Sequence, residues 1–496
     1  MKAKSLTRGA GILLSISSLP SAYGIGTFGN AAFRFIDLLA DLKQKYWQVL
    51  PMGPITMGDS PFQSISVFAG NPYYIDLDDL IEEGLLKREE VVSHNWGNNQ
   101  ENVDYSILYR NRYHVLRTAY QRFDTESYDY ITFCRQNASW LDDYSLFMAI
   151  KEQQEQKAWN EWEEDLKNRN PRRLAQCAET MKEETGFWNF CQYYFFKQWQ
   201  TLRQYAAKHG VQMIGDMPFY VAYDSVDVWK HRNLFQLDDA GNMLRVAACP
   251  PDRFSETGQV WGNPVYNWEE MERDGFAWWQ QRMEEHAAMF DAVKLDHFIG
   301  VVKYFSIPAG ENSLRHGKWV KGPGKKLADV LEKAACGKPI IAENMGTVLP
   351  AVNRMVQKLG WPDMKVLQFA FDGNADNEYL PHNYTDTNTV VYAGTHDNDT
   401  LMGYYRNQTE YEIAYLYSYL NIDKKEDIPD AYIRLAYSSI ADVVIFQMQD
   451  ILQLGNEARM NQPSTVGSNW KWRILEDALP EERRNWIRTQ TALFRR

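Results

Sequence analysis

The stretch AVKLDHF, residues 292–298, is a run of aliphatic and β-branched residues that ends at the carboxylate of Asp296. Two other stretches repeat the pattern: IIAEN contains Glu343, and VVYAGTHDND ends in a polar run that contains Asp397. In a parallel α/β barrel the carboxyl ends of all strands open on one face, where chemistry is carried out. The three stretches therefore predict a barrel with three carboxylates at one end.

Eight apolar runs along the chain have the composition of buried parallel strands, rich in Val, Ile and Leu without strict alternation. They are GILLSIS from Gly11, YWQVLPM from Tyr46, VQMIGDMPFYV from Val211, AVKLDHF from Ala292, PIIAEN from Pro339, VLQFAF from Val366, TVVYAGTHD from Thr389 and DVVIFQMQDIL from Asp442. Helical patterns lie between several of them, such as NAAFRFIDLLADLKQ after the first and KKLADVLEKAA before the fifth. We therefore predict an α/β fold, a (β/α)8 TIM barrel.

The predicted strands are unevenly spaced, which indicates insertions in the barrel. Residues about 85–205 are helix-like and charged, and we interpret them as a largely helical insertion. Residues about 222–290 contain the loop PPDRFSETGQVWGNP, and we interpret them as an active-site loop region. No β-sandwich pattern follows the eighth strand. We expect residues 1–496 to form a single catalytic barrel domain without a C-terminal β-sandwich domain.

Bulk composition excludes some partners. The net charge of −12 argues against nucleic acid and anionic membranes, because phosphate binding needs a basic face. The five cysteines form no CxxC pair, which suits a reducing compartment. The N-terminal GAGILLSISSLPSA superficially resembles a secretory leader, but its apolar part is short and broken by serines, so we interpret it as the first strand. We expect a cytoplasmic protein that does not cross a membrane; its oligomeric state stays open.

Each strand-end carboxylate has a structural and a catalytic interpretation. Asp296 could be a helix N-cap or a structural ion pair, and Glu343 a salt-bridged core residue. Lys294 lies two residues before Asp296 on the same strand face, where its charge would keep a nucleophile ionised. Glu343 ends an apolar strand, where partial burial would raise the pKa of a general acid. Two carboxylates meeting across a sugar are what cleavage of a glycosidic bond requires.

The run THDND offers a competing interpretation, because His396, Asp397 and Asp399 could bind a metal ion. A histidine and an aspartate that bind sugar hydroxyls explain the same residues, and no zinc-type spacing supports the metal. Other polar clusters are expected at the same barrel end and are candidates for substrate binding: Ser60, Gln63, Asp216, Trp261, Asn263 and Asp372.

The chain resembles the 4-α-glucanotransferases, also called amylomaltases or disproportionating enzymes, of glycoside hydrolase family 77. The resemblance runs from about Gly11 to Arg473. The matching stretches are SSLPSAYGIGTFG, WQVLPMGP, GDSPFQSISVFAGNPYYIDL, IGDMPFYVAYDSVDVW, PPDRFSETGQVWGNPVYNW, LDHFIG, IIAEN, LQFAFDG, YAGTHDNDT and LGNEARMNQPSTVGSNWKWR.

The resemblance implies roles for individual residues. Asp296 aligns with the catalytic nucleophile, Glu343 with the general acid/base, and Asp397 with a third carboxylate that stabilises the transition state. The positions of Asp216, His297 and His396 match residues that contact sugar, and Trp261 matches a ring that packs against the glucan. The family needs no metal or organic cofactor. Expected partners are α-1,4-glucans and maltooligosaccharides, with glucose or maltose as acceptor.

The chain departs from the family pattern at several positions, among them Arg253, which replaces a usual aromatic residue in the PPDxF loop. Lys294 stands where the family usually has Arg, Asn344 follows the acid/base where Asp is usual, and Phe62 replaces a usual Tyr. The lysine ammonium is a point charge, whereas the arginine guanidinium is a planar group with donors in fixed directions.

Two other functions stay open at this stage: an α-1,4-glucan hydrolase of the α-amylase type, and a weakly active glucan-binding protein. We expect the PPDRFSETGQVWGNP loop, with Phe254 and Trp261, to limit access of water and so favour transfer.

Overall fold

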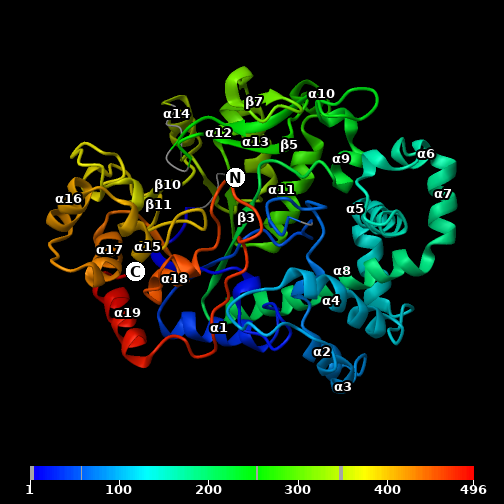
Figure 1. The fold of residues 1–496 in the computed structure, drawn as a ribbon, viewed down its shortest axis with the longest axis horizontal. Helices are drawn as coiled ribbons and strands as arrows, with labels where there is room; N and C mark the ends of the chain where they lie inside the picture. The colour runs from blue at the N-terminus through cyan, green and yellow to red at the C-terminus, as the bar shows by residue number, and fades with distance from the viewer. Residues whose placement is uncertain (1–4, 57, 253–254, 346–349) are drawn as a thin grey trace.

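The computed structural model describes residues 5–56, 58–252, 255–345 and 350–496. Eight parallel strands close into a barrel in the order β1-β12-β11-β10-β9-β6-β3-β2 (Figure 1). The strands are β1 (Gly9–Leu13), β2 (Tyr46–Gln48), β3 (Gln212–Met217), β6 (Ala292–Leu295), β9 (Ile340–Ala342), β10 (Asp363–Val366), β11 (Thr389–Tyr392) and β12 (Val443–Gln447). The predicted barrel is confirmed. Around the ring the strands follow chain order.

One strand was predicted at the wrong place. The run VLQFAF was expected to form the sixth strand, but β10 ends at Val366 and Leu367–Phe369 form a 3₁₀ turn. The strand consists of the preceding four residues, in which only Met364 and Val366 are buried. Leu367 and Phe369 are also buried, although they lie beyond the strand. Because the strand and the turn after it both contain buried apolar residues, the hydrophobic pattern of the sequence cannot tell which of them is the strand.

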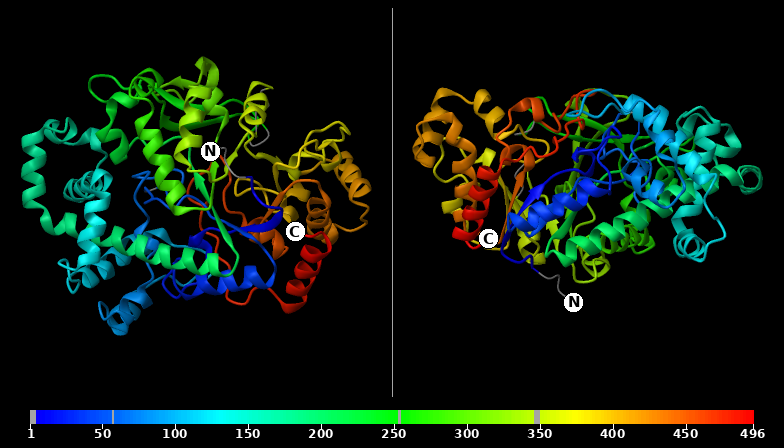
Figure 2. Two further views of the ribbon diagram at one scale, coloured as in Figure 1. Left: turned by 180° about the vertical axis from the view of Figure 1, so that it is seen from behind. Right: turned by 90° about the horizontal axis from the view of Figure 1, so that it is seen from below.

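Helices cover the outside of the barrel. The predicted patterns form α1 (Asn30–Asp41) and α13 (Lys325–Ala334), whose buried apolar residues recur at helical spacing. Between β2 and β3 the chain forms α4 (Tyr105–Tyr120), α5 (Tyr128–Gln153), α7 (Pro171–Thr180) and α8 (Lys182–Lys208). Figure 2 shows these helices extending to one side of the barrel, opposite α16 (Glu410–Leu420) and α17 (Ile428–Ser438). The α8 helix packs on α5, on α1 and on β3, so it joins the extension to the barrel.

A second sheet, which the sequence did not predict, lies beside the barrel. Its four strands are antiparallel in the order β5-β4-β7-β8. They are β4 (Arg245–Cys249), β5 (Gln259–Pro264), β7 (Lys303–Pro308) and β8 (Lys318–Lys321). The expectation that QVWGNP is loop is wrong, because it is strand β5. Two strands of the sheet, β7 and β8, lie beyond β6 in the chain, so no local pattern reveals the pairing of β4 with β7.

After β12, residues 448–496 form the helices α18 (Met448–Ile451) and α19 (Glu481–Leu493) and no strand, in agreement with the expected lack of a C-terminal sandwich in this part of the chain. Among the described residues, none of the helices has the length and apolar character needed to span a bilayer.

Because β1 and β2 pack closely at Gly11, we expect a larger residue at this position to destabilise the barrel. A Cβ at this position would lie 2.5 Å from the backbone oxygen and 2.5 Å from the Cβ of Tyr46, neither of which can move without shifting the barrel wall. Overpacking of this kind costs about 1–3 kcal/mol. We expect Gly11→Ala to lower the midpoint of thermal inactivation. Gly58→Ala is the control, since nothing lies within 4 Å of its added Cβ. Equal midpoints for the two variants would contradict this packing.

Candidate active site

The centre of the site is Lys294 on β6, whose side chain is only 2 % exposed. Its Nζ lies 2.5 Å from Glu343 Oε2, 2.9 Å from Asp216 Oδ2 and 3.6 Å from Asp296 Oδ1. Strand register explains the cluster, because Asp216 on β3 pairs directly with Lys294 on β6. Glu343 follows β9, which pairs with β6 on its other side. Three consecutive strands of the barrel therefore bring their carboxylates to one cation.

The expected contact between Lys294 and Asp296 exists, but it is the longest of the three. Both Asp216 oxygens accept hydrogen bonds from Nζ, at 3.2 and 2.9 Å. Burial opposes the charge of the ammonium group, yet Asp216, Glu343 and Asp296 together raise the pKa of Lys294 well above its ordinary value. Lys294 is therefore a permanent cation beneath the cleft.

The pKa values of Asp296 and Glu343 are shifted in opposite directions. Burial, and then the charge of Glu343, raises the pKa of Asp296 well above its ordinary value. Burial alone would also raise the pKa of Glu343, but the nearby Lys294 and a hydrogen bond with Asp296 bring it below the ordinary value. The sequence led us to expect the opposite, an ionised Asp296 and a Glu343 of raised pKa. The reason for the difference is that Lys294 lies closer to Glu343.

His297 and His396 flank the carboxylates. His297 has a left-handed backbone, with φ of 45°, and burial lowers its pKa to about 4, so its ring is neutral. The rings of Trp261 and His297 meet at nearly a right angle, with centroids 4.8 Å apart. His396 stacks on Phe62 with centroids 5.0 Å apart and rings 19° from parallel. These rings form the apolar walls that a sugar face can contact.

Asp397 lies on the loop that follows β11. Its Oδ1 accepts a hydrogen bond of 2.6 Å from Asn461 Nδ2, and its Oδ2 lies 3.5 Å from His396 Nε2. The sequence analysis did not propose Asn461 as a site residue. Its only signal was its place in the matching stretch LGNEARMNQPSTVGSNWKWR.

A cleft of about 1170 Å³ opens above these groups. It is lined by Asp296, Glu343 and Asp397 and by Ser60, Gln63, Trp261, Asn263, His297 and His396. Asp216 and Lys294 lie beneath it. The volume exceeds the range of about 300–1,000 Å³ that holds a drug-sized ligand, so several sugar units fit.

Two polar residues on one wall of the cleft, Gln63 and Asn263, form hydrogen bonds with each other. The amide groups of Gln63 and Asn263 exchange two hydrogen bonds, of 3.0 and 3.1 Å. Asn263 also donates to the carbonyl of Val221 at 2.7 Å and is 4 % exposed. The pair thus ties β5, which carries Trp261, to the loop that carries Ser60. Phe254 lies outside the described residues.

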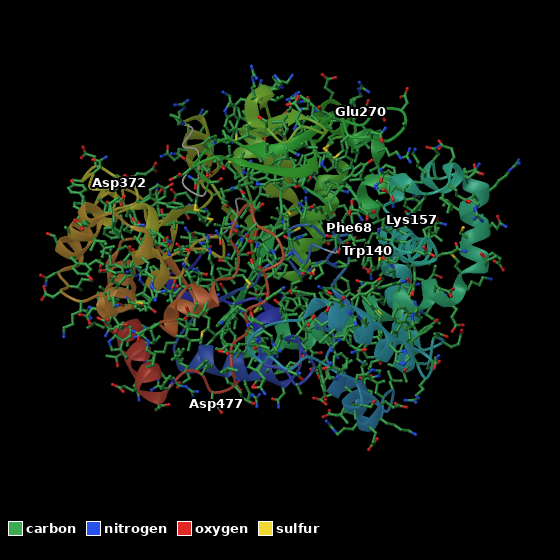
Figure 3. The ribbon with its side chains drawn as sticks, viewed as in Figure 1. Phe68, Trp140, Lys157, Glu270, Asp372 and Asp477 are labelled. Carbon is green, nitrogen blue, oxygen red and sulfur yellow. The ribbon has the colours of Figure 1, made fainter. Side chains whose placement is uncertain are left out.

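Asp372 is not part of the cleft. It is exposed, and its carboxylate accepts hydrogen bonds from the backbone of Asn374 and from the side chain of Asn377, at 3.0 and 2.9 Å. It lines a separate cavity of about 340 Å³ that shares only Asp397 with the cleft. Figure 3 shows Asp372 on the flank of the molecule near α16. The structure therefore does not bring it to the three carboxylates, because the strand before it ends earlier than expected.

Comparison with known proteins agrees with this arrangement. A family model described as 4-alpha-glucanotransferase matches residues 14–477. The 4-alpha-glucanotransferase of Clostridium butyricum is 43 % identical over 488 residues, which are 97 % of this chain and 100 % of that protein. The chain belongs to the 4-α-glucanotransferase family. Its activity is accordingly the transfer of glucan segments, and the alternative of a hydrolase of the α-amylase type is not favoured.

Other members of the family support the same assignment. The 4-alpha-glucanotransferase of Thermus thermophilus is 42 % identical over 488 residues, covering 96 % of this chain and 97 % of the relative. The structure of an amylomaltase from Streptococcus agalactiae in complex with acarbose superposes with a TM-score of 0.95 at 38 % identity, covering 99 % of both chains. The Corynebacterium glutamicum amylomaltase, at 16 % identity and a TM-score of 0.77 over 98 % of this chain and 75 % of the other, shares the fold.

Because Lys294 lies beside Asp296 and Glu343, we expect its charge to influence how kcat/KM depends on pH. Lys294→Met removes the charge and keeps most of the side chain's volume. The pKa values of both Asp296 and Glu343 then rise, because a nearby cation favours the ionised carboxylate. We expect both limbs of the kcat/KM–pH profile to move to higher pH, with at least ~10-fold less activity on the acidic side of the optimum. Lys294→Arg keeps the charge and should retain substantial activity. An unchanged profile for the Met variant would remove Lys294 from the electrostatics of the site.

Proposed function

We propose that this enzyme transfers α-1,4-glucan segments with retention of configuration, through a covalent intermediate on Asp296. The observation that supports this is the closeness of the two reacting carboxyl groups. Glu343 Oε2 and Asp296 Oδ1 both lie near Lys294 Nζ, at 2.5 and 3.6 Å, so these two oxygens are at most about 6 Å apart. Inverting glycosidases keep their carboxyl groups roughly 6.5–9.5 Å apart to hold a water between them.

In the first step, Asp296 attacks the anomeric carbon of the donor glucan. The bond from this carbon to the bridging oxygen breaks, and Glu343 gives its proton to that oxygen. Because the pKa of Asp296 is raised and that of Glu343 is lowered in the free protein, glucan binding has to favour the proton on Glu343 before this step. Asp397 stabilises the positive charge that develops on the sugar ring.

In the second step, an acceptor sugar replaces the leaving group. Glu343, now ionised, removes the proton of the acceptor 4-hydroxyl as this oxygen bonds to the anomeric carbon and the bond to Asp296 breaks. Lys294, at 2.5 Å, stabilises Glu343 in the ionised form that this step needs. We propose maltooligosaccharides, glucose and maltose as acceptors. We also propose a cytoplasmic location, in keeping with five unpaired cysteines.

Incubation with maltotriose tests the proposal. We expect glucose and a ladder of longer maltooligosaccharides, while the number of reducing ends stays nearly constant. A steady rise in reducing ends without longer products would show that water is the main acceptor. An inverted product anomer, observed by NMR at early times, would contradict the covalent intermediate.

Substitution of the carboxylates tests their individual roles. Asp296→Asn and Glu343→Gln should each lower kcat by at least ~10³-fold, because the covalent and the proton-transfer steps are both required. Asp397→Asn should be comparably damaging while the thermal midpoint stays near that of the unmodified enzyme. If any one of these variants kept near-normal turnover, its assigned role would be wrong.

Trp261 is predicted to favour the sugar acceptor over water. Its ring lines the cleft beside His297 and is held by a 3.1 Å hydrogen bond from Nε1 to Gln259 Oε1. Removing the ring takes away a stacking surface and admits water. We expect Trp261→Ala to raise the ratio of hydrolysis to transfer on maltotriose, whereas Trp261→Phe should change it less. Equal ratios for the Ala variant and the unmodified enzyme would exclude this role.

A further inference from the structure

Arg459 connects the two chain segments that present Asp397, although it touches none of the three carboxylates of the site. Its guanidinium group makes three contacts in different directions. One terminal nitrogen donates to the backbone carbonyl of Asp397 at 2.7 Å, and Nε donates to the backbone carbonyl of Asn461 at 2.7 Å. The other terminal nitrogen forms an ion pair with Asp399.

Asp399 is itself fixed, so the guanidinium group has a firm anchor. Its carboxylate accepts hydrogen bonds from Asn456 Nδ2 at 3.0 Å and from Asn407 Nδ2 at 2.8 Å. Its backbone carbonyl accepts another, of 2.8 Å, from Gln368 Nε2. The Arg459 and Asp399 side chains are 20 % and 13 % exposed, so solvent screens their attraction only in part.

The second segment orients the Asp397 carboxylate. Asn461 Nδ2 donates to Asp397 Oδ1 at 2.6 Å, and the Asn461 backbone N–H donates to the carbonyl of His396 at 3.1 Å. Arg459 therefore fixes the main chain on both sides of the Asn461–Asp397 hydrogen bond. If either segment moved, the carboxylate would lose this bond.

A support of this kind is needed because Asp397 does not lie on a strand or helix. β11 ends at Tyr392, before Asp397, and the next helix, α15 (Leu401–Tyr404), begins four residues after it, so Asp397 lies in the loop between them. Loop positions hold side chains less firmly than regular elements do, and a misplacement of about 1 Å can cost roughly 10²-fold in rate.

We propose that Arg459 is a positioning residue that holds the Asp397 carboxylate in its reactive place, through the main chains of Asp397 and Asn461. The inference rests on the proposed role of Asp397 in transition-state stabilisation. The three acceptors lie around one planar group with fixed donor directions, a geometry that the point charge of lysine does not reproduce. The rival role is direct contact with the substrate, since Arg459 also lines the cavity next to Asp372.

The test is Arg459→Lys, with Arg483→Lys as a matched control. Arg483 has the same type of contacts, an ion pair with Asp430 and a 2.8 Å hydrogen bond from Nε to the carbonyl of Ile451, but it lines no part of the cleft. The measurements are kcat and KM on maltotriose and the midpoint of thermal inactivation. We expect Arg459→Lys to lower kcat at least ~10-fold, with KM within about threefold and a midpoint no lower than that of the control. Arg483→Lys should keep kcat.

Two further variants keep the proposal falsifiable. Asp399→Asn weakens the anchor without shortening any side chain, and it should lower kcat in the same direction if Arg459→Lys fails to fold. In an Asp397→Asn background, Arg459→Lys should lower the residual activity by less than about twofold, because the group that it positions is already lost.

The outcomes separate the possibilities. An equal kcat for Arg459→Lys and Arg483→Lys would overturn the proposal, and so would a rise in KM alone, which would show substrate contact. A full additional loss in the Asp397→Asn background would also overturn it. Near-normal turnover of Asp397→Asn itself would instead contradict the proposed function of that carboxylate.

Discussion

The site depends on one interaction, the placement of the buried Lys294 ammonium among three carboxylates. Each partner comes from a different part of the barrel wall: Asp216 from β3, Asp296 from the end of β6 and Glu343 from the end of β9. Carboxylates this close could not all remain ionised without the cation, and the buried cation would itself be costly without them. Three carboxyl groups around one ammonium group give the cluster net negative charge while at least two of them are ionised. That charge suits a transition state in which the sugar becomes positive.

This arrangement also shifts the pKa values of the two reacting carboxyl groups in opposite directions. In the ligand-free protein burial and the charge of Glu343 raise the pKa of Asp296, whereas Lys294 outweighs burial and lowers the pKa of Glu343. The reactive form has the proton on Glu343, one hydrogen bond away. Lys294 supplies the positive charge at this position as a point charge, without the planar donor geometry of an arginine.

Much of the fold could be predicted from the sequence, because the buried strands of a parallel barrel have continuous apolar sequences. All eight were recognised, and only β10 was displaced, by a buried 3₁₀ turn at Leu367–Phe369 that is as apolar as a strand. The β5-β4-β7-β8 sheet was missed because its strands are short and its central pairing, between β4 and β7, spans β6 in the chain. In the site, strand ends predicted that Asp296, Glu343 and Asp397 would meet in one cleft, and the structure places them there. Sequence spacing could not reveal that Lys294 lies closest to Glu343, because this depends on a contact between segments distant in the chain. Asp372 was misplaced because the end of β10 before it was predicted too late; its carboxylate caps its own loop through Asn374 and Asn377.

The central claim is that Asp296 forms the covalent bond to sugar. It is tested most directly by mass spectrometry of Glu343→Gln incubated with α-maltosyl fluoride. Fluoride leaves without a proton, so the first step proceeds, whereas the second step lacks its base and the intermediate accumulates. The account predicts a mass increase of one maltosyl unit, located on the peptide that contains Asp296. A maltosyl group on any other residue, or release of fluoride with inversion and without an adduct, would contradict it.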